Sequence, residues 1–234
     1  MRVGVIQSCY LPWRGYFDFI ASVDVFVIYD DVQFTRKAWR NRNRVKTQDG
    51  FSWMTVPVVV HGRPAIDEVA IANVDKSWRD RHLALLTQSL GRAPYFQDAL
   101  KLWTEGTAGV DTSLSHLNVT LLRTICQYLG IQTTLLNSRD YHATGSGTVR
   151  MINLLQELGA TCYLSGPSAS DYLEEETFAG QGIRLEYKSY DYAPYPQQFG
   201  DFVDGVTILD LIANMGPEAV TFLRTRTPDI VAVP

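Results

Sequence analysis

Residues 7–18 read Gln7-Ser8-Cys9-Tyr10-Leu11-Pro12-Trp13-Arg14-Gly15-Tyr16-Phe17-Asp18. They follow an apolar run, Val3–Ile6, that predicts a buried strand, and they lead into a predicted helix at Trp13–Ser22. A second apolar run, Val25–Tyr29, ends in Asp30-Asp31. Two buried strands joined by a helix are typical of an open parallel α/β sheet, in which ligands bind beyond the carboxyl ends of the strands. We therefore expect a ligand site at residues 7–18.

The rest of the sequence continues to alternate between predicted helices and strands. The helices are expected at residues 76–90, 95–103, 112–129, 148–158, 208–215 and 218–224, the strands at 66–71, 131–136, 161–164 and 183–187, and a turn at 178–182. Asp49-Gly50 predicts a hairpin turn within residues 45–60. The predicted fold class is α/β, a Rossmann-like three-layer sandwich with a mainly parallel sheet plus a β-hairpin and helical insertion. We expect one domain, residues 1–234, with a hairpin and helical lobe at about 41–130.

Composition restricts the class of protein. Of the 234 residues, 46 % are hydrophobic and 20 % are charged, enough to fill a core, and the net charge of −4 gives no general attraction to nucleic acid or acidic membranes. No apolar run approaches the roughly 20 residues of a membrane span. The first residues lack the layout of a signal peptide. Three cysteines far apart in the sequence suggest reduced thiols in a cytoplasmic protein. They form no zinc pattern with the four histidines, and no metal ligand is assigned.

The two predicted strand ends bring together groups that suit catalysis. Gln7, Cys9 and Tyr10 follow the first strand, while Asp30 and Asp31 follow the second. Adjacent carboxylates can act as a base or hold Mg²⁺, or they can merely cap a turn. A thiol at a helix N-terminus has a lowered pKa and can act as a nucleophile. No histidine is near Cys9 in the sequence, however, and a cysteine is often a small buried filler.

Residues 36–46 form a basic stretch, with six basic residues out of eleven and no acidic one. The forks of Arg40, Arg42 and Arg44 suit phosphate or carboxylate, and Asn41 and Asn43 suit the polar edges of a sugar or a base. Trp39 offers a stacking face. A phosphate or carboxylate pocket is the favoured interpretation. A solvated charged loop and a platform for single-stranded nucleic acid are the alternatives.

Two later stretches are further candidates for ligand contact. In Ser165–Tyr172, Gly166 allows close backbone approach, and Ser168 or Ser170 can cap a short helix that faces an anion, although a simple capped turn explains the pattern equally well. The aromatic stretch Tyr187–Phe199 suits a sugar or another amphipathic ligand, or an irregular loop packed on the core.

Taken in order, five motifs resemble those of the WbqC-like protein family. They are Gln7–Asp18, Asp24–Phe34, Trp39–Asn43, Leu158–Pro167 and Gly205–Ile212. The resemblance covers essentially the whole chain. It implies a bacterial cytoplasmic protein that makes surface polysaccharides or secondary metabolites from an amino sugar, a sugar nucleotide or an amino-acid derivative. The family often has Asn where this chain has Cys9, so the resemblance does not imply a thiol mechanism common to the family.

The leading hypothesis is therefore an enzyme that transfers an acyl or aminoacyl group to an amine. Asp31, Asp30 and Cys9 are the candidate catalytic residues, and the candidate substrate-binding residues are Gln7, Tyr10, Trp13, Tyr16, Arg40, Asn41, Arg42, Asn43, Arg44, Ser165, Gly166 and Tyr172. The alternatives are a non-catalytic protein that binds a carrier protein or a sugar nucleotide, and a tRNA-dependent aminoacyl transferase. A carrier protein or an aminoacyl-tRNA is a further partner under these hypotheses. We expect neither membrane association nor specific DNA binding, and the sequence leaves any cofactor open.

Overall fold

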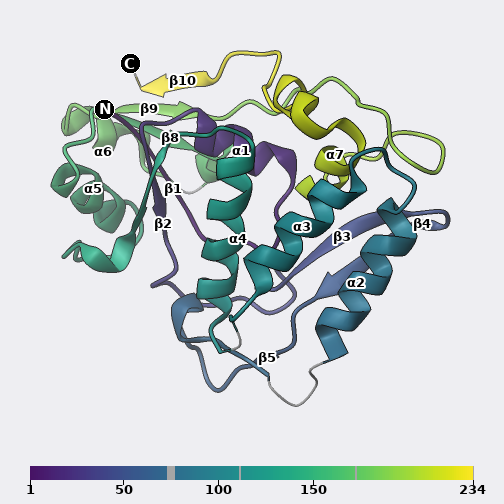
Figure 1. Ribbon diagram of the computed structural model, residues 1–234. Coiled ribbons are helices and arrows are strands. Elements are labelled where there is room, and N and C mark those ends of the chain that lie inside the picture. The colour runs from purple at the N-terminus through teal and green to yellow at the C-terminus, as the bar shows by residue number, and fades with distance from the viewer. Residues whose placement is uncertain (73–76, 111, 172, 234) are drawn as a thin grey trace.

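A computed structural model describes residues 1–72, 77–110, 112–171 and 173–233. Its main sheet has six strands in the order β10-β9-β8-β1-β2-β7 (Figure 1). Five strands are parallel, namely β1 (Arg2–Ile6), β2 (Val25–Ile28), β7 (Thr134–Asn137), β8 (Cys162–Ser165) and β9 (Arg184–Tyr187), while β10 (Ile230–Val233) is antiparallel to β9. The prediction of an α/β fold with a mainly parallel sheet is confirmed.

Helices cover both faces of this sheet because side chains alternate along each strand. Val3, Val5 and Val27 pack with residues of α5 (Gly147–Glu157) and α6 (Glu175–Gly180) on one face. Residues such as Phe26 belong to the other core, with α1 (Arg14–Ala21) and α4 (Leu114–Tyr128). Helix α1 lies so close to β1 that a Cβ atom on Gly4 would be 2.3 Å from the ring of Phe19.

The direction in which the chain adds strands reverses between β1 and β8. From β1 the chain continues outward to β2 and β7, then returns to the other side of β1 to form β8 and β9. The connections that leave β1 and β8 therefore diverge, and such a point is where open parallel sheets bind ligands, beyond the carboxyl ends of the strands.

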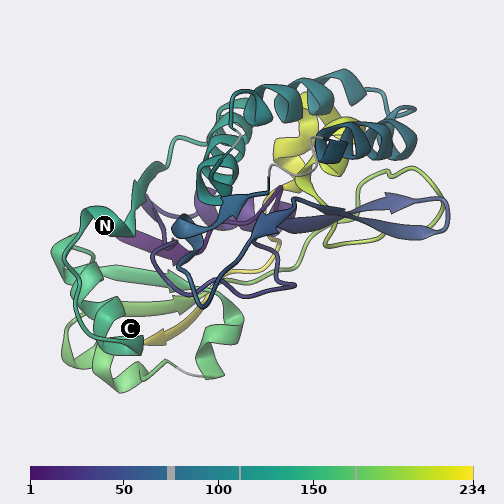
Figure 2. The same cartoon turned by 90° about the horizontal axis from the view of Figure 1, so that it is seen from below.

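The hairpin and helical lobe lies beside the sheet (Figure 2). Strands β3 (Arg42–Thr47) and β4 (Gly50–Thr55) form the predicted hairpin, and β5 (Val58–Val59) pairs with β6 (Ala70–Ile71). Helices α2 (Ser77–Leu90) and α3 (Phe96–Thr107) follow. Helix α3 packs against α4 and α7 (Ile208–Met215), and one buried apolar cluster runs from α1 through α4 into the lobe.

Several predicted elements differ from those observed. Residues 66–71 do not form one strand, because the Glu68 carboxylate accepts a hydrogen bond from the Ala65 N–H at 2.8 Å and closes a 3₁₀ turn, η1 (Ile66–Glu68), before β6. Helix α6 occupies part of the predicted turn, and a 3₁₀ helix, η4 (Gly216–Phe222), replaces the helix expected at 218–224. Two further 3₁₀ turns are η2 (Ser138–Asp140) and η3 (Pro167–Asp171). Strand β10 was not predicted.

Candidate functional site

Two adjoining cavities lie at the carboxyl ends of β1 and β8. Their volumes are about 610 and 420 Å³, and both are lined by Ile6, Arg40, Ser168 and Tyr190. We call the pair the switch cleft, because it lies where the strand order of the sheet changes direction. Gln7, Ser165 and Gly166 line its larger cavity, and Cys9, Trp13, Tyr16, Asn43 and Arg44 line its smaller one. Of the candidate catalytic and substrate-binding residues, the structure therefore brings together nine, Arg40 included.

The segment after β1 reaches the cleft through a sharp turn. Leu11 has a positive φ of 46°, which is rare for a residue with a side chain. The buried amide of Asn43 stabilises this turn by donating to the Leu11 carbonyl at 2.6 Å. The Tyr10 N–H donates to the Trp39 carbonyl at 3.1 Å. Residues 9–13 and the basic stretch are thus joined into one wall of the cleft.

Arg40 occupies the centre of the cleft. Its Nη1 donates to the carbonyl of Gln7 at 3.2 Å and to the Cys9 sulfur at 2.8 Å, and its Nη2 donates to the side-chain oxygen of Gln7. None of these acceptors carries a full negative charge, and within the described part of the chain no carboxylate lies within 4 Å of Arg40. The guanidinium is therefore fixed at the end of β1 with its charge available to an anionic ligand.

Cys9 beside Arg40 is not an activated thiol in this structure. It is 7 % exposed. Burial raises the pKa of the thiol above its ordinary value, and the nearby Arg40 guanidinium opposes that rise only in part. No histidine is among the described residues that line the cleft. The thiol is therefore neutral at neutral pH.

The two candidate tyrosines have different surroundings. Tyr16 lines the smaller cavity and donates its hydroxyl to the Gln7 carbonyl at 2.9 Å. Tyr10 is fully buried in the lobe core, where its hydroxyl contacts His82 Nδ1 at 3.0 Å and accepts from Trp103 Nε1 at 3.0 Å. Tyr10 therefore supports the wall of the cleft from behind and does not line it.

The basic stretch divides between two surfaces. Arg40 and Arg44 line the cleft, and Arg44 Nε donates to the Gly205 carbonyl at 3.1 Å. The side chain of Asn41 is buried and donates to the Val56 carbonyl at 2.9 Å. Arg42 lies over the ring of Trp53, with its guanidinium carbon 4.2 Å from the ring centre, on the outer face of the hairpin. Tyr172 lies outside the described residues.

Asp30 and Asp31 do not line the switch cleft. Asp30 is 4 % exposed and accepts hydrogen bonds from the Ser8 N–H at 2.7 Å, the Ser8 hydroxyl at 2.6 Å and the Ser115 hydroxyl. It thereby ties the ends of β1 and β2 to α4. Asp31 accepts from the Ser138 hydroxyl at 2.5 Å and forms an ion pair with Arg150.

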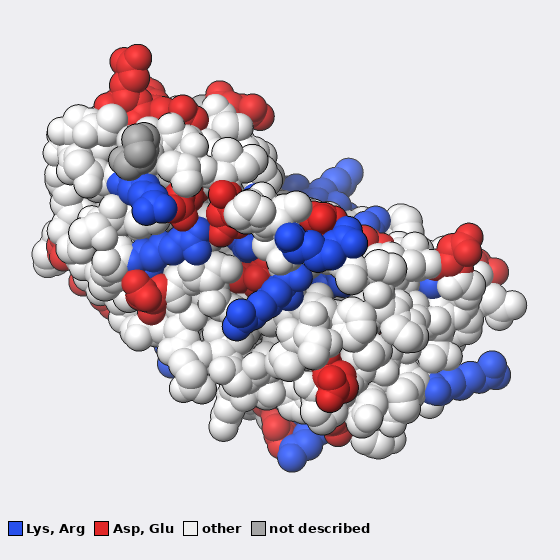
Figure 3. All heavy atoms as spheres, turned by 90° about the horizontal axis from the view of Figure 1, so that it is seen from above, with Lys and Arg blue, Asp and Glu red and all other residues white. Residues whose placement is uncertain are grey.

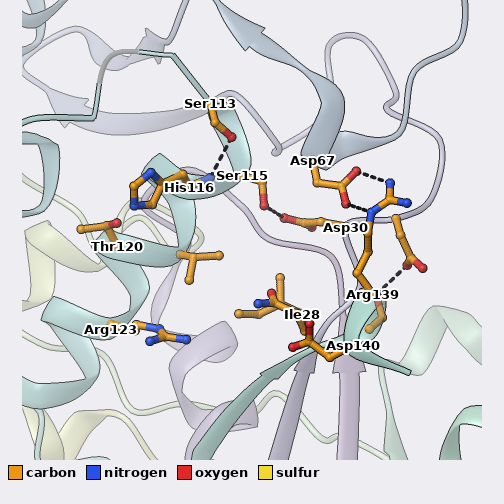
Figure 4. Close-up of a pocket in the computed structure, with 14 residues that line it drawn as sticks. Ile28, Asp30, Asp67, Ser113, Ser115, His116, Thr120, Arg123, Arg139 and Asp140 are labelled. Atoms are coloured by element: carbon orange, nitrogen blue, oxygen red, sulfur yellow. Dashed lines mark hydrogen bonds and ion pairs between the residues drawn. The ribbon is translucent and has the colours of Figure 1, made fainter. Parts of the chain in front are cut away.

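These two carboxylates instead border a third cavity of about 460 Å³, lined largely by α4, β2, β7 and η2, which we call the α4 cavity (Figure 4). Arg139, on its rim, forms an ion pair with Asp67 at 2.5 Å. Arg123 points inward from α4. Within the described chain, no group of three or more His, Cys, Asp or Glu side chains could hold a metal ion.

Arg150 connects the two sites. Its guanidinium pairs with Asp31 on the side of the α4 cavity and donates at 3.0 Å to the hydroxyl of Tyr29, a residue that lines the switch cleft. The Arg150 guanidinium carbon also lies 4.9 Å from the centre of the Tyr29 ring. Arg150 therefore links the lining of the switch cleft to that of the α4 cavity.

The sequence profile of the WbqC-like protein family matches residues 7–222. The chain belongs to the WbqC-like protein family. It is also 46 % identical over 228 residues to a protein from Mycobacterium tuberculosis (strain ATCC 25618 / H37Rv) named "Uncharacterized protein Rv1507c", with 95 % of this chain and 97 % of that protein covered. No solved structure matches the chain.

In this WbqC-like chain the resembling motifs converge on the cleft. Gln7, Trp13 and Tyr16 from the first motif, Arg40 from the third and Ser165 from the fourth all line it. Sequence reasoning missed Tyr29 and Tyr190 as individual cleft residues, although the aromatic stretch 187–199 contains Tyr190. The edge of Trp13 packs on Tyr190 with ring centres 5.1 Å apart. The role of Arg150 had no local signal, because its partners are 119 and 121 residues away.

Charges on the side of the WbqC-like protein seen from above are mixed in sign. Basic and acidic side chains alternate along a band across this face (Figure 3). Elsewhere in the chain opposite charges also pair, for example Arg2 with Asp229 at 2.7 Å and Arg226 with Asp191 at 2.5 Å. Such a face produces no extended field of one sign. Among the described residues, no helix has the length and apolarity needed to cross a membrane.

Proposed function

We propose that this WbqC-like protein is a biosynthetic acyl- or aminoacyltransferase that binds an anionic, amine-bearing building block in the switch cleft and joins the activated acyl or aminoacyl group of a second substrate to its amine. The observation that carries the proposal is Arg40, a cation with only neutral acceptors, held at the carboxyl end of β1 and shared by both cavities. The strand order of the parallel part, β7-β2-β1-β8-β9, corresponds to the 3-2-1-4-5 order of nucleotide-binding Rossmann-like sheets. It supports a sugar nucleotide or another nucleotide-activated compound as the ligand.

The lining residues suggest how such a ligand is divided between the cavities. Arg40 and Arg44 suit its phosphate or carboxylate groups, and the exposed Trp39 at the rim suits a base. The larger cavity, with the Gln7 side chain and the Ser165 hydroxyl, is then left for the second substrate. The setting implied by the family resemblance is bacterial, cytoplasmic synthesis of polysaccharides or secondary metabolites.

Arg40 also provides a chemical contribution. In amide formation the amine nitrogen attacks the activated carbonyl, a C–N bond forms, the bond to the leaving group breaks, and the nitrogen loses a proton to the leaving group or to water. Negative charge develops on the carbonyl oxygen during the attack. A fixed guanidinium that is already positioned stabilises that charge without reorganisation. This path needs no thiolate at Cys9, consistent with the raised pKa of that thiol.

Binding and turnover test the proposal separately. Calorimetric titration with UDP-, dTDP- and GDP-linked amino sugars should give saturable binding to the wild type. Arg40→Gln should weaken it at least ~10-fold, because a hydrogen bond to a charged group contributes roughly 1.5–3 kcal/mol. Arg123→Gln, an exposed arginine of the α4 cavity, is the matched control and should bind as the wild type does. Equal affinities for Arg40→Gln and the wild type would contradict the assignment of the cleft.

A second function, binding without catalysis, is favoured by one observation. No carboxylate or imidazole is among the described residues that line the switch cleft, so this part of the chain offers no obvious general base. A sugar-nucleotide-binding protein would saturate in the titration. It would yield no amide product by mass spectrometry when an amino sugar nucleotide is mixed with acyl-coenzyme A, an aminoacyl adenylate or aminoacyl-tRNA.

A further inference from the structure

The outer face of the β3–β4 hairpin carries large exposed aromatic side chains. Trp39, Phe51 and Trp53 are 44, 47 and 41 % exposed, and Arg42 and Arg44 lie among them. We call these five residues the hairpin face. The hairpin projects from the body of the molecule (Figure 2), and the rings of Trp39, Phe51 and Trp53 are exposed on it.

Strand alternation explains why these residues point outward. Asn43, Val45 and Met54 point to the opposite side of the hairpin and are buried against the body. On the side of the rings Lys46 is buried as well, because Lys46 and Arg44 donate to backbone carbonyls of residues 200–205, whereas Phe51 and Trp53 remain exposed. In the antiparallel register Arg44 is opposite Trp53, and cross-strand partners share one side of a sheet. The exposed rings therefore contribute little to the core, and polar side chains could replace them without loss of the fold.

Rings and guanidinium groups alternate across the hairpin face. The ring centres of Trp39 and Trp53 are 5.4 Å apart, and those of Phe51 and Trp53 are 6.1 Å apart. The guanidinium carbon of Arg42 lies 4.2 Å from the centre of the Trp53 ring, and that of Arg44 lies 5.0 Å from the centre of the Phe51 ring. These contacts hold the cations in place beside the ring surfaces.

The charge of this face is positive on a chain whose net charge is −4. Among the described residues, no carboxylate lies within 4 Å of the guanidinium groups of Arg42 or Arg44, whose hydrogen bonds go to backbone carbonyls. The single acidic residue within the hairpin strands and turn is Asp49, at the turn. An anionic partner is therefore favoured over a neutral or a basic one.

We propose that the hairpin face binds single-stranded nucleic acid without sequence preference. Unpaired bases can stack on the exposed rings while phosphates contact Arg42 and Arg44. Proteins commonly bind single-stranded nucleic acid in this way, on surfaces that combine aromatic and basic side chains. A duplex does not expose its base faces, so it gains only the phosphate contacts. A neutral oligosaccharide can stack on tryptophan, but it has no negatively charged group to pair with Arg42 and Arg44.

The hairpin face is continuous with the switch cleft, because Trp39 and Arg44 belong to both. A single-stranded nucleic acid bound on the hairpin face would reach the mouth of the smaller cavity. The inference does not depend on the proposed transfer, since binding can be measured without substrate. Trp53, Phe51 and Arg42 lie outside the cleft lining, so substitutions there separate a failure of this inference from a failure of the proposed function.

The test uses the full chain and fluorescence anisotropy with 5′-labelled 12-nucleotide oligo(U) RNA, oligo(dT) DNA and a 12-base-pair duplex. We expect at least one single strand to bind at 50 mM NaCl, at least ~10-fold tighter than the duplex, and to weaken strongly at 300 mM NaCl. Binding of both single strands supports readout of bases and phosphates alone. A preference for RNA supports the inference with an added contact to the 2′-hydroxyl.

Trp53→Ser and Arg42→Gln should each weaken binding at least ~10-fold, while Trp53→Phe, which keeps a ring, should stay within about threefold of the wild type. Ile230→Ser and Arg226→Gln alter an exposed apolar residue and an exposed arginine elsewhere, and they should bind as the wild type does. Unchanged binding by Trp53→Ser and Arg42→Gln, equal binding of the duplex, or binding of maltoheptaose but of no oligonucleotide would overturn the inference.

Discussion

The guanidinium of Arg40 lies 2.8 Å from the sulfur of Cys9, yet burial outweighs that contact and keeps the pKa of the thiol above its ordinary value. An arginine beside a cysteine usually suggests an activated thiolate. Here the same arginine also binds backbone and side-chain oxygens of Gln7, and the thiol is one of several neutral acceptors that orient it.

Alkylation of Cys9 should therefore be slow at pH 7 and should accelerate only at a higher pH than in the unfolded chain, because burial raises the pKa of the thiol and the thiolate is the reacting species. Iodoacetamide labelling followed by peptide mass spectrometry measures the rate at each pH. The protein unfolded in urea is the control and should react at an ordinary rate. Rapid labelling of folded Cys9 at pH 7 would show an activated thiol and would revive a covalent mechanism.

Asp30→Ala should destabilise the fold by roughly 2–4 kcal/mol, since it leaves the buried Ser8 N–H and two hydroxyls without their acceptor. Urea denaturation followed by tryptophan fluorescence measures the loss. Asp140→Ala removes an exposed carboxylate nearby and should change stability by less than about 0.5 kcal/mol. A small effect of Asp30→Ala on stability, together with lost turnover, would favour the catalytic role predicted from the sequence.

Because His82 is buried, we expect the free energy of unfolding to fall in acid. Burial lowers the pKa of its imidazole from 6.5 to about 4, so the folded state holds the ring neutral while the unfolded chain protonates it near pH 6.5. Its contribution is complete above pH 6.5 and is lost as the pH falls towards 4, by about 3 kcal/mol in total. His82→Gln should flatten this part of the curve of unfolding free energy against pH. An unchanged slope in the variant, or an imidazole that titrates near 6.5 by NMR in the folded protein, would contradict the prediction.

Gly4→Ala should destabilise the protein by about 1–3 kcal/mol, because the added methyl group would lie 2.3 Å from the ring of Phe19. The double variant Gly4→Ala with Phe19→Leu should lose less stability than the two single changes summed, since the smaller side chain leaves room for the methyl group. Gly180→Ala is the matched control, as an added Cβ there meets nothing within 4 Å. Thermal unfolding of the wild type, the two single variants at positions 4 and 19 and the double variant gives the coupling energy between these positions.

Local patterns were sufficient to predict the parallel strands and the long helices. Val3–Ile6 and Val25–Tyr29 are β-branched runs whose burial needs no knowledge of the partner strands. Asp49-Gly50 predicted a hairpin turn, and the turn lies one residue earlier, at Gln48 and Asp49. Strand β10 was missed although Ile230–Val233 is a short apolar run like those of β1 and β2. The order of the sheet, which creates the switch cleft, depends on long-range pairing that no local pattern encodes.

Part of the lining of the switch cleft could also be predicted from local patterns. Gln7, Arg40 and Ser165 were identified from strand ends and charge, and they do line one cleft. Asp30 and Asp31 also follow a strand end, but Ser8, Ser115 and Arg150 engage their oxygens, and the sequence gives no indication of that pairing. Arg42 lies outside the cleft, over the ring of Trp53, although it shares a side of β3 with Arg44, which lines the cleft; no local pattern distinguishes the two arginines.

The insertion of β8 beside β1 has a consequence for the order in which the protein can fold. Arg2 pairs with Cys162, so the second edge of the earliest strand stays open until more than half of the polypeptide has been made. Contacts between residues so far apart in sequence form late and slowly. A nascent chain therefore carries β1 as an exposed, apolar edge throughout synthesis of the lobe. We expect refolding in vitro to be slow and accompanied by aggregation at high protein concentration. The unpaired edge of β1 is the site at which we expect this aggregation to begin.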